Sequence, residues 1–166
     1  PLVQRLRGAV FGVIGMGRIG MATALRARAF GMRILFYDPH LPSGVELSLG
    51  FERVLDLESL VSQADVMSIH APLDQSTERL INRNLLGVGK RGQILVNTAR
   101  GPIVDLDAVY ECLQSGQLGG AGLDVLPEEP ANPSHPLIKA YHERVEWLEG
   151  RLILTPHAAF YSPSSV

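Results

Sequence analysis

The stretch FGVIGMGRIGMATALRARAFGMRILFYDPH, residues 11–40, contains the pattern that decides the fold. A short apolar run leads into Gly15, Gly17 and Gly20, which have the spacing G-x-G-x-x-G. A segment with helical periodicity follows, and a second apolar run ends at Asp38. A glycine loop between a strand and a helix, with an acidic residue about 20 positions further on, predicts a dinucleotide-binding unit.

Each residue of this pattern has a physical role. Gly15 permits the tight turn, Gly17 lets a pyrophosphate approach the backbone, and Gly20 lets the helix pack closely on the strand. The free N–H groups at the start of the helix bind phosphate. Asp38 can accept hydrogen bonds from the adenosine ribose and would repel a 2′-phosphate, so we expect NAD rather than NADP as the cofactor.

The composition is that of a globular protein with no affinity for nucleic acid or for an anionic membrane. The 166 residues are 46% hydrophobic and 19% charged, with a formal net charge of -2. The single cysteine, Cys112, excludes an internal disulfide and fits a reducing compartment, so a cytoplasmic location is expected. No histidine or cysteine spacing indicates a metal site, and no apolar run is long enough to span a membrane.

Apolar runs and helical patterns alternate along the whole chain. This order predicts an α/β fold with a doubly wound parallel sheet, the Rossmann fold, and helices on both faces. We treat residues 1–166 as one dinucleotide-binding domain. The expected strands are residues 10–14, 33–37, 66–70, 93–97, 120–125 and 151–154, and the expected helices are residues 18–30, 56–63, 82–86, 105–115 and 137–148. Residues 162–166 have the pattern of a helix start, so we interpret the chain as a fragment of a longer protein.

Three further motifs follow in order: VNTARG at residues 96–101, GLDVLPEEP at 122–130 and TPHAAFYS at 155–162. Together with the glycine loop they resemble the D-2-hydroxyacid dehydrogenase family over nearly the whole chain. HAAFYS and FYDPH favour the branch that contains the C-terminal-binding-protein (CtBP) corepressors. The match to that branch is partial, because the residue matching Phe160 is usually tryptophan there. The resemblance implies a cofactor domain whose substrate domain is absent, an inactive isolated fragment, and a homodimer in the full-length protein.

The resemblance also implies the catalytic residues. Arg100 matches the arginine that holds and polarises the substrate carboxylate through two parallel hydrogen bonds. His157 matches the acid–base histidine, which can protonate a 2-keto oxygen and recover the proton in the reverse reaction. Its carboxylate partner is Glu129 or Glu128, and we choose Glu129 because it directly precedes Pro130.

The cofactor contacts follow from the same resemblance. Arg18 and Ile19 are expected at the pyrophosphate, and the segment 71–77, with Ala71, Pro72 and Thr77, below the adenosine. Thr98, Ala99 and Asp124 are expected near the nicotinamide, which Arg100 and His157 also border. Asp124 would accept a hydrogen bond from the carboxamide.

Two functions of different classes remain open. The first is the cofactor half of an oxidoreductase that transfers a hydride between NAD(H) and a small 2-hydroxy or 2-keto acid. The second is an NAD-sensing binding module similar to the corepressors, which also keep Arg100, Glu129 and His157. A Rossmann methyltransferase is a weaker alternative, because it leaves those three residues without a role.

Overall fold

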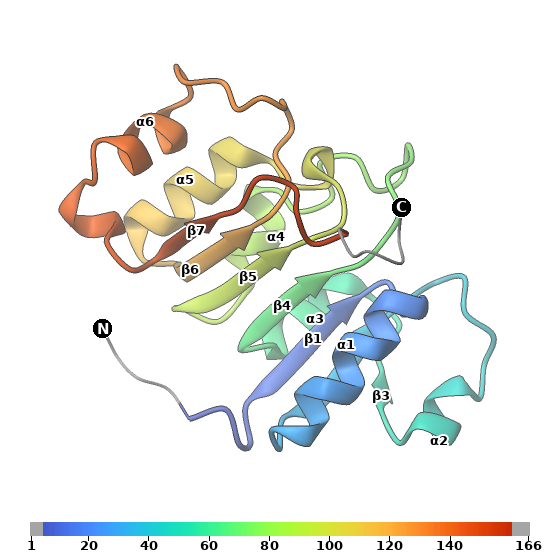
Figure 1. Cartoon of the computed structure of the whole chain (residues 1–166). Helices are drawn as coiled ribbons and strands as arrows, with labels where there is room; N and C mark the ends of the chain where they lie inside the picture. Colours follow the sequence, from blue (N-terminus) through green and yellow to red (C-terminus); the bar gives the residue numbers. More distant parts are fainter. Residues whose placement is uncertain (1–4, 161–166) are drawn as a thin grey trace.

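The computed structural model describes residues 5–160 and contains one seven-stranded sheet. All strand pairs are parallel, and the strand order is β3-β2-β1-β4-β5-β6-β7 (Figure 1). The predicted parallel sheet is therefore confirmed, whereas the expected helix start at 162–166 lies outside the described residues. The strands are β1 Val10–Ile14, β2 Arg33–Tyr37, β3 Glu52–Arg53, β4 Val66–Ile69, β5 Gln93–Asn97, β6 Leu118–Leu123 and β7 Leu152–Leu154.

Helices connect the strands. They are α1 Arg18–Ala29, α2 Val45–Leu49, α3 Leu57–Gln63, α4 Arg83–Gly87, α5 Leu106–Ser115 and α6 Pro136–His142, with 3-10 turns at Gly101–Ile103 and Glu146–Leu148. Four of these helices begin at a residue whose side chain accepts a hydrogen bond from a free backbone N–H of the first turn. Those residues are Asp56 before α3, Asn82 before α4, Asp105 before α5 and His135 before α6.

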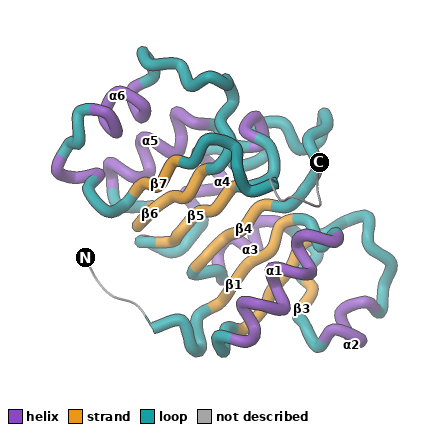
Figure 2. Tube along the Cα trace, viewed as in Figure 1, coloured by secondary structure: helices purple, strands orange, loops and turns teal. Residues whose placement is uncertain are grey.

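Helices pack on both faces of the sheet, as the sequence predicts (Figure 2). On one face α1 covers β1 and β2, and its Ala24 is buried in a cluster with Val13 and Phe36. On the opposite face α3 packs against the same two strands. Gly12 makes this contact possible, because a Cβ at this position would lie 2.8 Å from Leu60 Cδ2.

The two faces are not covered equally. Leu152 and Leu154 of β7 pack into the larger core cluster, which includes residues of α5 and α6. Ile153 lies between them in sequence and therefore points to the opposite face, where it is 66% exposed. On the α1 face, the described helices thus cover β1 and β2 but leave β7 open.

The single helix expected over residues 137–148 is wrong. Helix α6 ends at His142, and a separate 3-10 turn covers Glu146–Leu148. The break falls at Arg144, whose φ of 52° is left-handed and cannot continue an α-helix. Leu148 is nevertheless buried, and Trp147 packs edge-on against Tyr110 of α5 at 5.8 Å between ring centroids.

Strand β6 begins and ends two residues earlier than expected. The register shifts between Gln93 and Ile94 of the neighbouring β5, which brings the start of β6 into the sheet. Gly119 permits this pairing, because a Cβ there would lie 2.3 Å from Gly92 O. Helix α2 and strand β3 are absent from the sequence prediction altogether.

Candidate dinucleotide and acid–base site

The glycine loop joins β1 to α1 at the carboxyl edge of the sheet, where the strand order reverses between β1 and β4. Gly15 has a φ of +89°, and a Cβ there would lie 2.6 Å from Ala71 N. A Cβ at Gly20 would lie 2.1 Å from Gly15 O. In contrast, a Cβ at Gly17 would meet nothing within 4 Å. Gly15 and Gly20 are thus required by packing, whereas Gly17 leaves open space beside the start of α1.

The N-terminus of α1 is free to bind an anion. Unlike α3, α4, α5 and α6, it has no side-chain cap, and its first turn contains no acidic residue. Arg18 and Ile19 are both exposed, Ile19 to 66%. Backbone N–H groups and the positive end of the helix dipole therefore face the open space next to Gly17, which is a favourable position for a phosphate.

Asp38 follows β2 and is bound to the glycine loop. Its Oδ2 accepts a hydrogen bond from Met16 N at 2.9 Å, and its Oδ1 accepts one from His40 N at 2.9 Å. A carboxylate has about four acceptor sites, so both oxygens keep capacity for the hydroxyls of a ribose. The structure thus fixes this carboxylate beside the glycine loop.

The segment after β4 lies against the glycine loop through Ala71, which is buried. Pro72 is exposed, and its carbonyl accepts a hydrogen bond from Thr77 Oγ1 at 2.7 Å. Asp74 closes the turn by accepting hydrogen bonds from Ser76 N at 2.7 Å and from Thr77 N at 3.2 Å. The segment is a hydrogen-bonded turn beside Gly15, and it follows the strand on the other side of β1 from β2.

Arg100 is presented by a turn that a buried asparagine shapes. Asn97, the last residue of β5, has no exposed surface. Its Nδ2 donates to Arg100 O at 2.9 Å, and its Oδ1 accepts from Ala99 N at 3.0 Å. Thr98 and Arg100 are exposed at the top of this turn, and Arg100 Nη1 donates to Ala99 O at 2.7 Å. Sequence reasoning assigned no role to Asn97.

His157 and Glu129 form a pair across the loops that follow β7 and β6. His157 Nδ1 lies 2.7 Å from Glu129 Oε2, and Glu129 Oε1 accepts a hydrogen bond from Leu126 N at 3.0 Å. The hydrogen bond from His157, and then the one from Leu126, lowers the pKa of Glu129 below its usual value. The carboxylate therefore stays ionised beside the ring and fixes the orientation of the ring.

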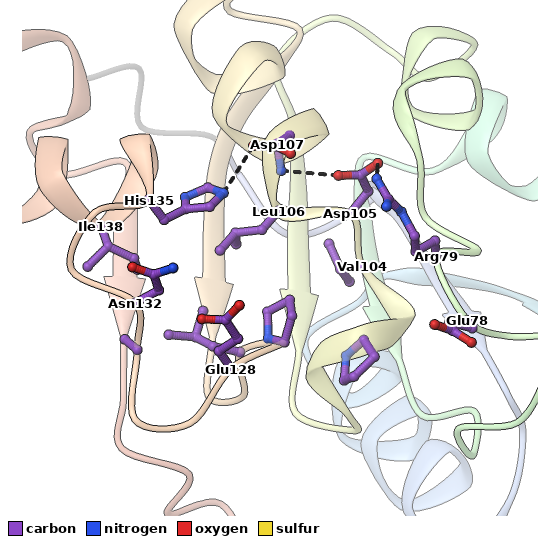
Figure 3. Close-up of a pocket in the computed structure, with 14 residues that line it drawn as sticks. Glu78, Arg79, Val104, Asp105, Leu106, Asp107, Glu128, Asn132, His135 and Ile138 are labelled. Carbon is purple, nitrogen blue, oxygen red and sulfur yellow. Dashed lines mark hydrogen bonds and ion pairs between the residues drawn. The ribbon is translucent and has the colours of Figure 1, made fainter.

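Glu128 points elsewhere. It lines a separate cavity of about 440 Å³ between the loop after β6 and the N-terminus of α5 (Figure 3). An ion pair between Arg79 and Asp105 at 2.6 Å borders that cavity, as does a contact of His135 Nε2 with Asp107 Oδ1 at 3.1 Å. Neither His157 nor Glu129 lines it. The contact geometry therefore favours Glu129 over Glu128 as the partner of His157.

Asp124 has a position that sequence reasoning did not anticipate. It is only 6% exposed, and its Oδ1 accepts hydrogen bonds from Thr155 Oγ1 and from Ala158 N at 3.0 Å, while Oδ2 accepts one from Ala159 N at 2.9 Å. Its backbone carbonyl accepts a hydrogen bond from His157 N at 2.8 Å. Burial raises the pKa of Asp124, but these hydrogen bonds outweigh it and hold the pKa below the usual value.

These hydrogen bonds between Asp124 and the segment 155–159, which we call the Asp124 clamp, explain the backbone conformation of His157. The residue has a φ of 52°, a left-handed conformation that an L side chain rarely adopts and that costs on the order of 1–3 kcal/mol. The surrounding hydrogen bonds to Asp124 keep it in place, and the ring of Phe160 contacts it edge-on at 5.4 Å between centroids. The partners of Asp124 lie 31–35 residues away, so no local sequence signal identifies them.

The three predicted catalytic residues come together. Arg100, Glu129 and His157 all line one cavity of about 230 Å³, although they follow three different strands, β5, β6 and β7. Among the other predicted residues, Gly15, Gly17, Gly20 and Asp38 gather at β1 and β2, and Ala71 joins them from β4. The candidate site therefore extends along the carboxyl edge of the sheet from β2 to β7.

No helix between residues 5 and 160 combines the length and apolar character needed to cross a membrane. In the same range, no three His, Cys, Asp or Glu side chains gather in a way that suits a metal ion. Cys112 is buried, and burial raises the pKa of its thiol.

The fold and the site define a dinucleotide-binding α/β domain that carries an arginine and a His–Glu pair at the carboxyl edge of its sheet. Comparison with known proteins gives the same class. Residues 1–159 match the family described as "D-isomer specific 2-hydroxyacid dehydrogenase, NAD binding domain". The chain belongs to this family, and NAD is its cofactor class.

Individual relatives agree. The chain is 46% identical to the glyoxylate reductase of Korarchaeum cryptofilum (strain OPF8) over 152 residues, which is 92% of this chain and 43% of that protein. It is 40% identical to the glyoxylate reductase of Thermofilum pendens (strain DSM 2475 / Hrk 5), with 93% and 43% covered. The chain thus spans less than half the length of the curated relatives it matches.

Solved structures show the same fold. The TT0316 protein from Thermus thermophilus superimposes with a TM-score of 0.83 at 43% identity, covering 99% of this chain and 48% of that one. The D-lactate dehydrogenase from Escherichia coli superimposes with a TM-score of 0.82 at 35% identity, covering 98% and 48%.

Proposed function

We propose that this chain is the cofactor half of a two-domain dehydrogenase that interconverts small 2-hydroxy and 2-keto acids. The observation that carries the proposal is the cavity shared by Arg100, Glu129 and His157 at the edge of the sheet that also holds the glycine loop. A cation, an acid–base group and a dinucleotide site in this arrangement suit hydride transfer to a carbonyl next to a carboxylate.

The residues fit NAD(H) on three independent observations. Space is open at Gly17, where a Cβ would meet nothing within 4 Å. The N-terminus of α1 has no side-chain cap. The Asp38 carboxylate is bound to the glycine loop through Met16 N. The first two features suit the pyrophosphate, and the third suits an unphosphorylated adenosine ribose.

The residues of this chain prepare the substrate and move the proton. Arg100 is exposed, so its guanidinium is accessible to hold a substrate carboxylate with two parallel hydrogen bonds and to polarise the adjacent carbonyl. His157 donates a proton from Nε2 to the 2-keto oxygen, because its Nδ1 is engaged by Glu129. Bound NADH supplies the hydride. In the reverse direction His157 takes the proton back.

Asp124 supports this chemistry through the turn of His157. Both of its carboxylate oxygens already accept hydrogen bonds from the segment Thr155–Ala159. We therefore assign Asp124 to holding His157 in place, and the carboxamide contact that the family resemblance implies stays a prediction. Thr98 and Ala99, in the turn before Arg100, remain the proposed neighbours of the nicotinamide.

The substrate class follows from the relatives and from the site. Glyoxylate is a 2-oxo acid, and two of the relatives are named glyoxylate reductases. The residues that would contact the substrate side chain belong to a second domain, as does the opposite wall of the cleft. A homodimer of the full-length protein is part of the same proposal and rests on family resemblance alone.

A CtBP-like corepressor module is the alternative, and it has less support. It rests on the sequence around His157 and Phe160, whereas three of the four relatives reported above are named as reductases or as a dehydrogenase. Turnover separates the two functions, because a binding module has no need to reduce 2-keto acids.

The test is steady-state reduction of glyoxylate and pyruvate by the full-length protein with NADH. We expect turnover, and Arg100→Ala should raise KM for the keto acid by on the order of 10²-fold while NADH affinity stays constant, because a charge-assisted bidentate contact is lost. Absence of turnover with any 2-keto acid, together with normal NADH binding, would favour the binding module.

A further inference from the structure

Arg53 lies on β3, next to the loop that follows Asp38. Its Nη1 donates a hydrogen bond to Leu41 O at 2.9 Å, and its Nη2 donates to Pro42 O at 2.7 Å. The side chain is only 14% exposed. A guanidinium in this position braces the loop by holding two consecutive backbone carbonyls with a rigid fork of donors.

The remaining faces of this guanidinium are also occupied. Its Nε lies 3.0 Å from Glu46 Oε2, a charge contact too poorly aligned for a hydrogen bond. The buried ring of Phe36 lies 5.2 Å from the guanidinium carbon, within cation–π range. Glu46 in turn accepts a hydrogen bond from Gly44 N at 3.0 Å. A nearly buried charge is tolerated only when it is paired in this way, so Arg53 has one well-defined geometry.

The braced loop is the one that orients Asp38. His40, which directly precedes Leu41, donates its backbone N–H to Asp38 Oδ1 at 2.9 Å. The other carboxylate oxygen is bound to Met16 of the glycine loop. If the carbonyl of Leu41 is released, the N–H of His40 is no longer held in place, and one of the two hydrogen bonds that orient Asp38 weakens.

We infer that Arg53 is a positioning residue for the adenosine ribose and that it sharpens the preference for NADH over NADPH by fixing the Asp38 loop. The inference rests on the proposed function, because the ribose role of Asp38 does. Arg53 itself need not touch the cofactor. It acts by keeping a large fraction of molecules in the conformation in which the carboxylate of Asp38 is ready to accept the ribose hydroxyls.

The chain offers a matched control in Arg151. This arginine also braces backbone carbonyls, with Nε donating to Gly119 O at 3.0 Å and Nη2 to Leu118 O at 2.6 Å. It sits at the amino end of β6, whereas Asp38 follows the carboxyl end of β2. With two further hydrogen bonds, to Trp147 O and Leu113 O, Arg151 donates four in all, against two from Arg53. Replacing Arg151 is therefore the harsher loss of bracing hydrogen bonds, at a position remote from the candidate cofactor site.

The experiment is a double-mutant cycle on the 166-residue chain, with NADH and NADPH titrated by fluorescence. Arg53→Met keeps the apolar stem and removes the fork. We expect it to weaken NADH binding about 3- to 10-fold, because the competent loop conformation becomes less populated. NADPH affinity should change less than about 2-fold, so the preference for NADH over NADPH becomes smaller. In an Asp38→Ala background, Arg53→Met should lower NADH affinity by less than about 2-fold, because Arg53 acts through Asp38.

Three outcomes overturn the inference. If Arg53→Met lowers NADH affinity equally in the wild-type and Asp38→Ala backgrounds, Arg53 acts independently of the Asp38 carboxylate. An equal loss of NADH affinity in Arg151→Met would show a general effect of destabilisation. Unchanged NADH affinity in Arg53→Met would show that the brace is irrelevant to binding. If the wild-type chain binds neither cofactor, the proposed function itself fails, and the inference fails with it.

Discussion

Replacing Gly17 with valine separates cofactor binding from folding. A Cβ at this position meets nothing within 4 Å, and the backbone is extended, with φ −70° and ψ −167°, which any residue adopts. The free energy of unfolding should therefore change by less than about 1 kcal/mol. The added side chain, however, fills the space that a pyrophosphate needs above the N-terminus of α1.

The expected loss of affinity follows from the hydrogen bonds that the phosphates lose. Each bond from a backbone N–H to a charged group contributes about 1.5–3 kcal/mol. Losing two of them costs about 3–6 kcal/mol, which raises the Kd for NADH on the order of 10²- to 10⁴-fold. NADH fluorescence measures the Kd, and thermal unfolding followed by circular dichroism measures the fold.

Gly20→Ala is the matched control for this prediction. Its new Cβ would lie 2.1 Å from Gly15 O, so the loop must shift, at a cost of about 1–3 kcal/mol. For a domain of this size, Tm should fall by about 2–12 °C. Gly17→Val with unchanged NADH affinity would refute the reasoning, because the phosphates would then lie away from the loop. A loss of Tm in Gly17→Val as large as in Gly20→Ala would refute it equally.

The remaining predictions concern Asp38 and Asp124. Asp38→Ala should narrow the NADH preference over NADPH, because it removes both the ribose acceptor and the repulsion of a 2′-phosphate; calorimetric titration with both cofactors measures this, and an unchanged ratio contradicts it. Asp124→Asn should raise amide hydrogen exchange at Ala159 on the order of 10-fold or more, since an amide group offers this N–H no second oxygen; unchanged exchange would show that the clamp is dispensable. In the wild type, the pKa of Asp124 is lower when folded than when unfolded, so its contribution to stability is complete above about pH 4 and is lost as pH falls through the folded value. Amide signals of Ala158 and Ala159 should therefore stay constant from about pH 7 to about pH 4 and shift only below, and a midpoint near about pH 6 contradicts the assignment.

The glycine loop and the main strands could be predicted because their signals are local. Gly15, Gly17 and Gly20 stand within six residues, and the strands β1, β2 and β5 have the bounds that their apolar runs predict. The helix starts at α3 and α5 differ from the prediction by one residue, because Asp56 and Asp105 are the caps rather than the first helical residues.

The parts that could not be predicted depend on contacts between distant residues. Helix α2 and strand β3 are short, and the charge contact between Glu46 and Arg53 ties them together, which no periodicity reveals. The left-handed Arg144 ends α6 without a glycine to mark the position. The role of Asp124 is likewise set by folding, since Asp124 meets its partners only when β7 lies beside β6. Asn97 differs, because its partners Ala99 and Arg100 are local in the sequence.

We propose that His157 is the proton donor in the reduction of a 2-keto acid. The most direct test is the rate of NADH oxidation by glyoxylate in the full-length protein under single-turnover conditions, for the wild type and for His157→Ala. We expect the rate in His157→Ala to decrease on the order of 10²- to 10⁴-fold, with NADH affinity retained. An undiminished rate in His157→Ala would contradict the acid–base assignment.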